Sequence, residues 1–527
     1  MRTQHFLVVL CLMVSNPMLA TRYHVNASAT GSATGLTWAN AFTDVQAALS
    51  IVIPGDEIWV AAGQYKTTTS TDRTVSFMLR NSVNLYGGFA GTETDLSQRD
   101  IALNPTTLNG DIGQLGDGSD NTHNIITANN IATTIVVDGF SIINGRSTGS
   151  FNGGALNLTN SLSGEIVLRN CSLFNNYASN YGGAIYLAAV RLRIENCTFF
   201  GNSTGSGGNG GAIYNGNNNG GAATLILRDC IFKSNVARQG ACLYNSLQYQ
   251  LLDIDRCIFT NNSSPNSIIH VGDLVSAVLS NSLIVGNTVN DFSGNVLYVN
   301  STTTGEFFSL INCTIAHNFN LYANTIQDDI VRFEDNDHQM ANCIIYGNTI
   351  HDGSQVNSVA AVSNSIIEGG YPSGTSILDT DPVFLDPYTG VPANFDCTVY
   401  DYRLDASSPG INAGSNGDVP VGADLDLAGA PRLQGGVVDI GCYESDQTVA
   451  IGTAIAAPPG WRFDMEHGEL VVPDADASKN ALVTIHGING QVHARILLQR
   501  TRTALDLEPG MYVVSWAGHA ALAFVVH

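Results

Sequence analysis

A short loop rich in glycine and aspartate holds the first group of side chains that could bind a ligand. Residues 109–124 read NGDIGQLGDGSDNTHN, which places Asp111, Asp117, Asp120 and Asn121 close together in the chain. Carboxylate and amide oxygens are the ligands that Ca²⁺ takes, so Asp111, Asp117 and Asp120 form a candidate calcium site. Gly-Asp loops also form Asx turns, in which carboxylates accept backbone N–H groups instead of holding an ion. No other cofactor is expected.

A second candidate site follows several glycine-rich turns. Aligning these turns places Asn157, Tyr186 and Tyr214 on one outward face, and it places Leu243 and Leu297 there as well. Tyr186 and Tyr214 would stack in neighbouring turns of the chain, where paired aromatic rings can lie against sugar rings. Asn157, Tyr186 and Tyr214 are therefore the candidate ligand-binding residues. In the alternative interpretation, the tyrosines cover an apolar strip beneath a loop.

Charged residues form a third group. Arg169, Glu195, Arg228 and Asp255 occupy equivalent places in successive repeats, so their signs alternate. Adjacent strands lie ~4.8 Å apart, and alternating charges at that spacing favour an ion-pair ladder over an acid–base centre for polysaccharide cleavage. A further acidic group is formed by Asp424 and Asp426 with Asp439, for which metal binding is the alternative to a structural role.

A repeated nine-residue phrase positions these side chains. It reads apolar, any, Asn or Asp, Cys or Ser, any, apolar, any, any, Asn, and it recurs every 22 to 33 residues. A loose period of this size is typical of a solenoid. The eight copies cover residues 168–176, 194–202, 227–235, 254–262, 279–287, 310–318, 340–348 and 362–370.

The third residue of the phrase indicates which solenoid this is. It is Asn or Asp in seven copies, namely Asn170, Asn196, Asp229, Asn281, Asn312, Asn342 and Asn364, and it is Arg256 in the other. Asn and Asp tolerate the left-handed backbone conformation, so each copy predicts a sharp corner between two short strands. We therefore expect an all-β, right-handed parallel β-helix in which corner asparagines form a hydrogen-bonded ladder. A degenerate first copy at 136–144 places Asp138 at its corner.

The cysteines follow the same geometry. Six of the ten lie directly after the corner, where Ser282 and Ser365 replace Cys in two copies, so we expect a stacked, unbridged column inside the core. No CxxC pair or Cys/His pair at metal-binding spacing is present. Cys397 and Cys442 are the one candidate disulfide.

Composition excludes some partners. The chain has 527 residues, a formal net charge of −23 and only three lysines, so it presents no basic stripe for nucleic acid. Residues 1–20 read as a signal peptide, with the apolar run FLVVLCLMV at 6–14. No later stretch approaches the ~20 apolar residues of a transmembrane segment.

Two parts follow the leader. Residues 21–445 are the expected β-helix, with an N-terminal cap that includes a helix over 43–50 capped by Thr43, and with regular coils at about 136–370. The second part is residues 446–527, where asparagine becomes rare from about Ala457 and alternating apolar residues predict a small C-terminal β-sandwich.

The chain also resembles two known families. WANAFTD at 38–44, GDEIWVAAG at 55–63, YGGFAGTET at 86–94 and DLAGAPR at 426–432 resemble secreted bacterial β-helix proteins of the choice-of-anchor Q group. That resemblance implies a pectate-lyase-like fold and a secreted or surface location, without a settled activity. LEPGMYVV at 507–514 and the terminal FVVH resemble the sorting domain of the type IX secretion system. That domain implies passage across the outer membrane, although the usual Asn-Pro and a final lysine are missing; an ordinary sandwich-type binding module is the alternative.

Two functions remain open. The favoured one is an exported cell-surface or secreted scaffold, non-catalytic, that binds a glycan or another surface partner. The alternative is a polysaccharide lyase or glycoside hydrolase acting on a strand face.

Overall fold

The computed structural model describes most of residues 20–445 and short parts of the tail. Within 20–445 the gaps are 217–222, 247–250, 273–275, 292–293, 301–306, 323–328, 336, 352, 358–360, 391–394, 396–398 and 435. The described tail comprises 462–464, 469–472, 482–487, 492–497, 501–505, 510–516 and 519–526. The predicted signal peptide, apart from Ala20, and Cys397 of the candidate disulfide lie outside these ranges.

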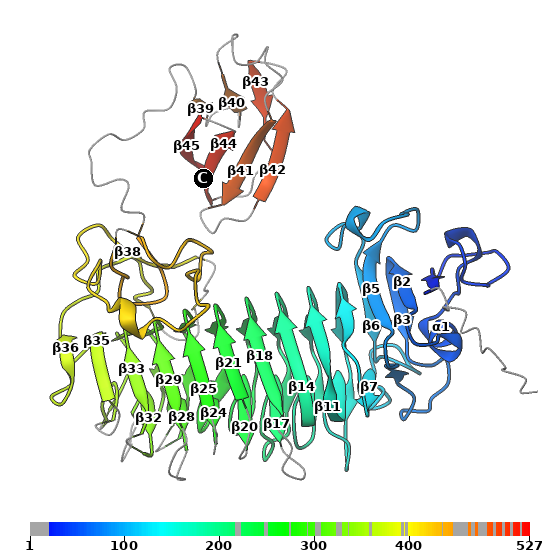
Figure 1. Ribbon diagram of the computed structural model, residues 1–527, viewed down its shortest axis with the longest axis horizontal. Coiled ribbons are helices and arrows are strands. Elements are labelled where there is room, and N and C mark those ends of the chain that lie inside the picture. The colour runs from blue at the N-terminus through cyan, green and yellow to red at the C-terminus, as the bar shows by residue number, and fades with distance from the viewer. Residues whose placement is uncertain are drawn as a thin grey trace, which may run out of the picture.

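The chain winds into the predicted right-handed parallel β-helix, whose strands form three stacks (Figure 1). The first stack contains β4 (Phe77–Met78), β7 (Ile126–Asn129), the start of β11 (Leu156–Arg169), the start of β14 (Ile185–Glu195), β17 (Ile213–Gly216), β20 (Leu243–Ser246), β24 (Ser267–Val271), β28 (Asn295–Val299) and β32 (Val331–Phe333). The second contains β1 (Arg22–Val25), β2 (Glu57–Ala61), β5 (Asn84–Phe89), β8 (Ile135–Asp138), the ends of β11 and β14, β18 (Thr224–Arg228), β21 (Leu251–Asp255), β25 (Ser276–Ser280), β29 (Phe308–Ile311), β33 (Gln339–Ala341) and β35 (Ala361–Ile367).

The third stack closes each coil. It contains β3 (Gly63–Lys66), β6 (Thr106–Asn109), β9 (Phe140–Ile143), β12 (Ser172–Phe174), β15 (Thr198–Phe200), β19 (Ile231–Lys233), β22 (Ile258–Thr260), β26 (Leu283–Val285), β30 (Thr314–Ala316) and β34 (Ile344–Tyr346), and β36 (Thr375–Leu378) pairs with β35. Short strands follow it in two small sheets, β10 (Arg146–Ser147) with β13 (Tyr177–Ala178) and β16 (Ser203–Thr204), and β23 (Ser263–Ser264) with β27 (Thr288–Val289) and β31 (Phe319–Asn320).

The N-terminal cap contains the predicted helix with a different first residue. Helix α1 spans Val45–Ile51, and the Asp44 carboxylate accepts the Ala47 N–H at 2.8 Å. Asp44 is therefore the N-cap rather than Thr43, because its carboxylate satisfies a free N–H at the positive end of the helix. The short 3-10 helices η1 (Trp38–Asn40), η2 (Leu96–Gln98) and η4 (Asn416–Asp418) lie in loops.

Each predicted corner contains one residue with a left-handed backbone. The angle φ lies between 46° and 56° at Asn170, Asn196, Asp229, Arg256, Asn281, Asn312, Asn342 and Asn364. The prediction of Asp138 as the corner of the first copy is wrong by one residue. Gly139 has φ 85°, and Asp138 is buried in register with Arg169. Glycine takes the left-handed conformation without a Cβ penalty, so the corner forms there.

The predicted corner ladder forms in part. Asn196 donates to Asn170 at 2.7 Å, and Asn342 donates to Asn312 at 2.9 Å. In the middle of the stack an ion pair replaces the amide bond, with Arg256 Nε 2.8 Å from Asp229 Oδ1.

A second asparagine ladder, which was not predicted, occupies the ninth position of the phrase. In the first six of its seven members, Nδ2 donates to the asparagine Oδ1 of the next coil at 2.9–3.1 Å. Six of the seven side chains are fully buried. The members are Asn176, Asn202, Asn235, Asn262, Asn287, Asn318 and Asn348.

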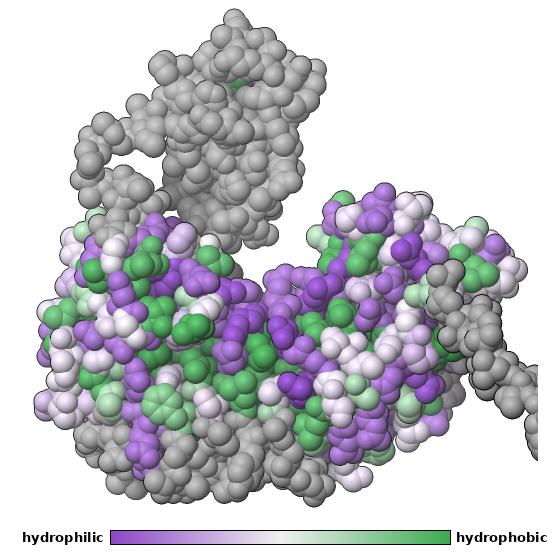
Figure 2. All heavy atoms as spheres, viewed as in Figure 1, coloured by the Kyte–Doolittle hydropathy of each residue, from purple (hydrophilic) through white to green (hydrophobic). Residues whose placement is uncertain are grey.

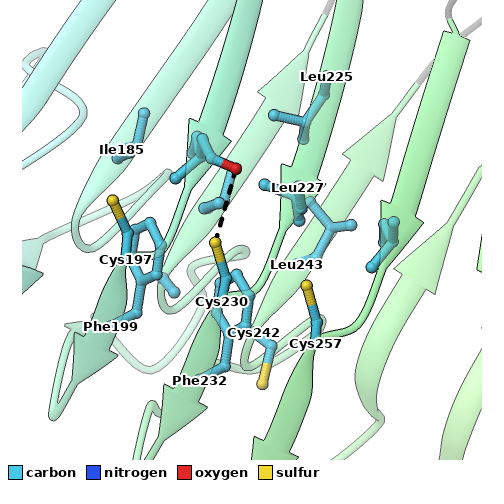
Figure 3. Close-up of a cluster of buried hydrophobic side chains, with 14 of the residues drawn as sticks. Ile185, Cys197, Phe199, Leu225, Leu227, Cys230, Phe232, Cys242, Leu243 and Cys257 are labelled. Atoms are coloured by element: carbon cyan, nitrogen blue, oxygen red, sulfur yellow. Dashed lines mark hydrogen bonds between the residues drawn. The ribbon is translucent and has the colours of Figure 1, made fainter. Parts of the chain in front are cut away.

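The cysteine column is confirmed. Figure 3 shows Cys197, Cys230 and Cys257 in successive coils beside stacked Phe199 and Phe232, whose ring centroids are 4.7 Å apart. The six phrase cysteines are free and buried, and burial raises the pKa of the thiols at Cys197, Cys257 and Cys313.

Residues 384–445 fold back over the outer face of the third stack. Phe384, Tyr402 and Ile440 pack against apolar residues of β26, β30 and β34. The antiparallel pair β37 (Phe384–Asp386) and β38 (Asp401–Leu404) lies in this segment. Cys442 is a buried free thiol there.

The described tail strands form two antiparallel sheets. One contains β39 (Arg462–Asp464), β40 (Glu469–Val471) and β43 (Arg502–Ala504); the other contains β41 (Leu482–Gly487), β42 (Val492–Leu497), β44 (Gly510–Trp516) and β45 (His519–Val526). Across the described residues, helices are too short or too polar to cross a lipid bilayer.

Candidate functional site

The outward face of the first stack carries a continuous row of aromatic side chains. Strand pairing places Tyr186, Tyr214, Tyr244, His270 and Tyr298 at one register position in successive coils. Neighbouring ring centroids are 5.7, 5.4, 4.2 and 5.2 Å apart. These five side chains are called the aromatic row. The predicted stacking of Tyr186 on Tyr214 is confirmed.

The row is longer than predicted because of a register error. Leu243 and Leu297 were expected to face outward, but both are fully buried. Gly240 has φ 61° and corresponds to the first glycine of the other Gly-Gly pairs, not to the second. A one-residue shift reverses the two faces of a strand, so Leu243 and Leu297 were wrongly assigned to outward positions, which Tyr244 and Tyr298 occupy instead.

Polar residues continue the row at both ends. Asn157 pairs in register with Tyr186, and its Nδ2 donates to the Asn152 carbonyl at 3.1 Å. Arg332 pairs in register with Tyr298. The Tyr298 hydroxyl donates to Glu334 at 3.0 Å.

The orientation of the rings determines what they can contact. The first four rings are nearly parallel, with interplanar angles of 7°, 3° and 10°. The faces of neighbouring rings are therefore turned toward one another and cover each other. This arrangement opposes the expectation that a sugar ring stacks on the faces of Tyr186 and Tyr214. The edge of an aromatic ring carries partial positive charge and attracts oxygen atoms. The four tyrosines of the row are half-buried and His270 is 5% exposed, so it is the tyrosine ring edges that can hold an oxygen-rich ligand.

Burial shifts the titration of the row. It raises the pKa of Tyr214 to about 12, with Ser246 opposing, and it raises the pKa of Tyr298 to about 12, together with the Glu334 charge. Burial lowers the pKa of His270 to about 4. The hydroxyls of Tyr214 and Tyr298 are thus protonated hydrogen-bond donors at neutral pH, and His270 is an uncharged ring.

Replacing His270 by phenylalanine is expected to flatten the pH dependence of stability. Because the folded pKa is about 4 and the ordinary value is 6.5, the folded state binds fewer protons between these values. The contribution of uncharged His270 to the free energy of unfolding is fully present above pH 6.5. It falls by about 3 kcal/mol as the pH is lowered to 4. Denaturant unfolding between pH 4 and 7 should show this loss in the wild type and not in His270→Phe. Tyr298→Phe, which leaves the imidazole in place, should keep the wild-type slope; an unchanged slope in His270→Phe would contradict the assignment.

The predicted charge ladder at the end of the second stack forms in part: Arg228 Nε lies 4.0 Å from Asp255, whereas the shorter ion pairs there each include a residue outside the predicted four. Arg193 pairs with Glu165 at 3.0 Å, and Arg228 pairs with Asp253. Arg169 pairs with Asp138 at 2.6 Å. Figure 2 shows hydrophilic residues along the hollow between the N-terminal cap and residues 384–445, on the side where these strands end. The charges serve mainly to join neighbouring coils.

The acidic loop does not assemble the expected calcium ligands. Asp111 accepts the Gly116 N–H at 2.9 Å, Asp117 accepts the Ser119 N–H at 2.9 Å, and Asp120 accepts the Gln114 N–H at 2.7 Å. Within the described ranges, no three acidic, histidine or cysteine side chains are grouped to hold a metal. The carboxylates instead close the loop, because each is nearest to a backbone donor of the same loop.

The second acidic group surrounds a buried arginine. Arg432 is 2% exposed; its Nη2 donates to the carbonyls of Asp439 and Gly441, and its Nε lies 3.3 Å from Glu444. The Asp426 carboxylate accepts the N–H groups of Ala430 and Glu444. Burial raises the pKa of Glu444 to about 8, and Arg432 opposes that shift. This group, called the Arg432 cluster, is structural.

Comparison with known proteins gives structural neighbours only. No family model and no curated protein sequence matches this chain. Three solved structures are similar in fold. "Crystal structure of pectate lyase Pel9A" has 13% identity and a TM-score of 0.47, over 81% of this chain and 98% of that one. "Rhamnogalacturonan lyase" has 12% identity and a TM-score of 0.39, over 66% and 87%. "The complex structure of XylC with xylose" has 10% identity and a TM-score of 0.39, over 80% and 98%.

Proposed function

We propose that this protein is an exported, non-catalytic β-helix scaffold that binds an extended, neutral glycan along the aromatic row. The observation that carries the proposal is the unbroken register of five rings, which the hydrophobic core does not require at an outward position. The row runs along the solenoid axis with one ring for each strand spacing of ~4.8 Å, which is comparable with the length of one pyranose unit.

The charge of the chain favours a neutral polymer. A net charge of −23 repels polyanions at long range. Ring edges and protonated tyrosine hydroxyls offer the glycan oxygens weak electrostatic contacts and hydrogen bonds that do not depend on charge.

The ionisable groups near the strand faces support a binding role. Arg193 and Arg228 are engaged with carboxylates of adjacent coils. The raised pKa of Tyr214 makes its hydroxyl a poor general base near neutral pH. A lyase or hydrolase acting on the same face is the alternative outcome of the polysaccharide assays.

Export belongs to the same proposal. It is supported by the leader-like residues 1–20 and by the resemblance of residues 446–527 to a type IX sorting domain. The secretion machinery would then be a partner, and the cell surface or the medium would be the final location.

Replacing Tyr186, Tyr214 and Tyr244 together by phenylalanine is expected to weaken retention by neutral polysaccharides at least several-fold. The variant keeps the stacked rings but loses three hydroxyl groups, each worth about 1 kcal/mol in a typical hydrogen bond. Affinity electrophoresis in gels containing neutral or acidic polysaccharides measures the change.

Phe200→Ser is the matched control, because Phe200 is an exposed aromatic residue on the third stack. It should migrate as the wild type does. The same polysaccharides are assayed for new reducing ends and ultraviolet-absorbing products. Turnover abolished by one carboxylate or arginine substitution would replace the non-catalytic proposal with the enzymatic one.

A further inference from the structure

A polar pocket lies beside the acidic loop, at the first coils of the solenoid. It has a volume of about 280 Å³, and its lining includes Asp111, Asn121, Asn144, Arg146 and Tyr177. Pockets for drug-sized ligands measure roughly 300–1,000 Å³, so this one suits a smaller molecule. It is separate from the five residues of the aromatic row.

Two of the residues that line this pocket each have a buried oxygen atom without a hydrogen-bond donor. Asp111 is 6% exposed; its Oδ2 accepts the Gly116 N–H, and its Oδ1 has no partner. Asn121 is 8% exposed; its Nδ2 donates to the Asn144 carbonyl at 2.7 Å, and its Oδ1 has no partner. A buried acceptor without a donor costs about 1–3 kcal/mol. A ligand that donates hydrogen bonds would remove that cost.

Arg146, which also lines the pocket, carries hydrogen-bond donors. The Arg146 guanidinium lies over the Tyr177 ring, 4.3 Å from its centroid. Within the described part of the chain it contacts this ring rather than a carboxylate, so its N–H groups are available to a ligand. One carboxylate and one guanidinium also balance the charge of the pocket.

This balance distinguishes between classes of ligand. Ca²⁺ takes six to eight oxygen ligands and favours several carboxylates, whereas here a guanidinium lines the same space. A neutral polyol has hydroxyl groups that donate to Asp111 and Asn121 and also accept from Arg146.

We infer that this pocket binds a single neutral sugar residue, held by hydrogen bonds from its hydroxyl groups to Asp111 and Asn121 and from Arg146 to its oxygens. The inference rests on the proposed glycan-binding function and adds a subsite for an individual residue, such as a chain end or a branch.

The test uses the mature chain and individual monosaccharides. Saturation-transfer NMR and titrations with glucose, galactose, mannose, xylose and rhamnose are run on the wild type, Asp111→Asn and Arg146→Gln. Asp111→Asn preserves shape but turns an acceptor into a donor. We expect at least one sugar to bind the wild type, with a dissociation constant about ten-fold higher in each variant, as the loss of one buried hydrogen bond implies.

Asp117→Asn is the matched control, since Asp117 lies in the same loop but does not line the pocket. It should bind sugar as the wild type does. Equal binding by Asp111→Asn and the wild type would overturn the inference. A melting temperature raised by CaCl₂ in the wild type but not in Asp111→Asn, without sugar binding, would replace it with a cation site. If the wild type is retained by polysaccharide gels but binds no monosaccharide, the pocket fails and the aromatic-row proposal stands; if polysaccharides are not retained either, the proposed function fails.

Discussion

Replacing Asn262 by leucine is expected to destabilise the solenoid by about 4 kcal/mol, because it leaves several buried groups unpaired. The Asn262 Oδ1 accepts from the backbone and side chain of Asn235, and its Nδ2 donates to the Phe232 carbonyl and to Asn287. Leucine restores none of these bonds. Denaturant unfolding should show an earlier transition, and hydrogen exchange should quicken in β19, β22 and β26.

The effect should stay local because each coil of a solenoid contacts only its neighbours. Exchange in β7 and β8 should therefore be unchanged. Asn290→Leu provides the control, since Asn290 is an exposed asparagine after β27; it should shift the transition by less than about 0.5 kcal/mol. A similar shift in both variants would show that the buried ladder is not what stabilises this region.

Replacing Arg432 by methionine is expected to cost about 4 kcal/mol, because removing one partner of a buried ion pair leaves charge uncompensated. Asp426, Asp439 and Glu444 would remain around an apolar side chain. The burial-raised pKa of Glu444, about 8, gives the pH dependence its sign. The carboxyl is mostly protonated below pH 8 and ionised above it, so the loss should be larger at pH 9 than at pH 6.

Thermal unfolding and limited proteolysis of residues 384–445 at both pH values measure this effect. Arg403→Met is the control: Arg403 pairs with Asp401 at 2.5 Å, but its side chain is 42% exposed, so the expected loss is below about 1 kcal/mol. An Arg432→Met protein as stable as Arg403→Met, with no pH dependence, would contradict the structural role of the Arg432 cluster.

The repeated phrase predicted those features that depend on local sterics. The left-handed corner at Asn170 and the inward place of Cys171 follow from backbone conformation and side-chain alternation alone. The second asparagine ladder had a visible signal, the final Asn of the phrase. It was missed because asparagine is common in exposed turns, and the residue type alone does not show whether a given asparagine is exposed or buried.

Features that depend on register or distant packing were predicted less well. Whether Gly240 is the first or second residue of its turn decides the face of Tyr244, and the letters alone fit both alignments. In the acidic loop, the carboxylates accept backbone N–H groups of the same loop. The spacing of Asp111 and Asp120 in the sequence did not indicate this. The meeting of Asp426 and Glu444 around Arg432 depends on tertiary contacts within residues 384–445.

In an oxidising compartment, the cysteine column would make the order in which the coils fold important. In the unfolded chain each thiol titrates near its ordinary pKa and is open to oxidants, and neighbouring phrase cysteines can form disulfides with one another. Once coils stack, burial removes access to the column and raises the pKa of the thiols at Cys197, Cys257 and Cys313. The order in which coils close therefore decides whether the column stays reduced, and a late-folding coil leaves its thiol exposed to the oxidant for longest.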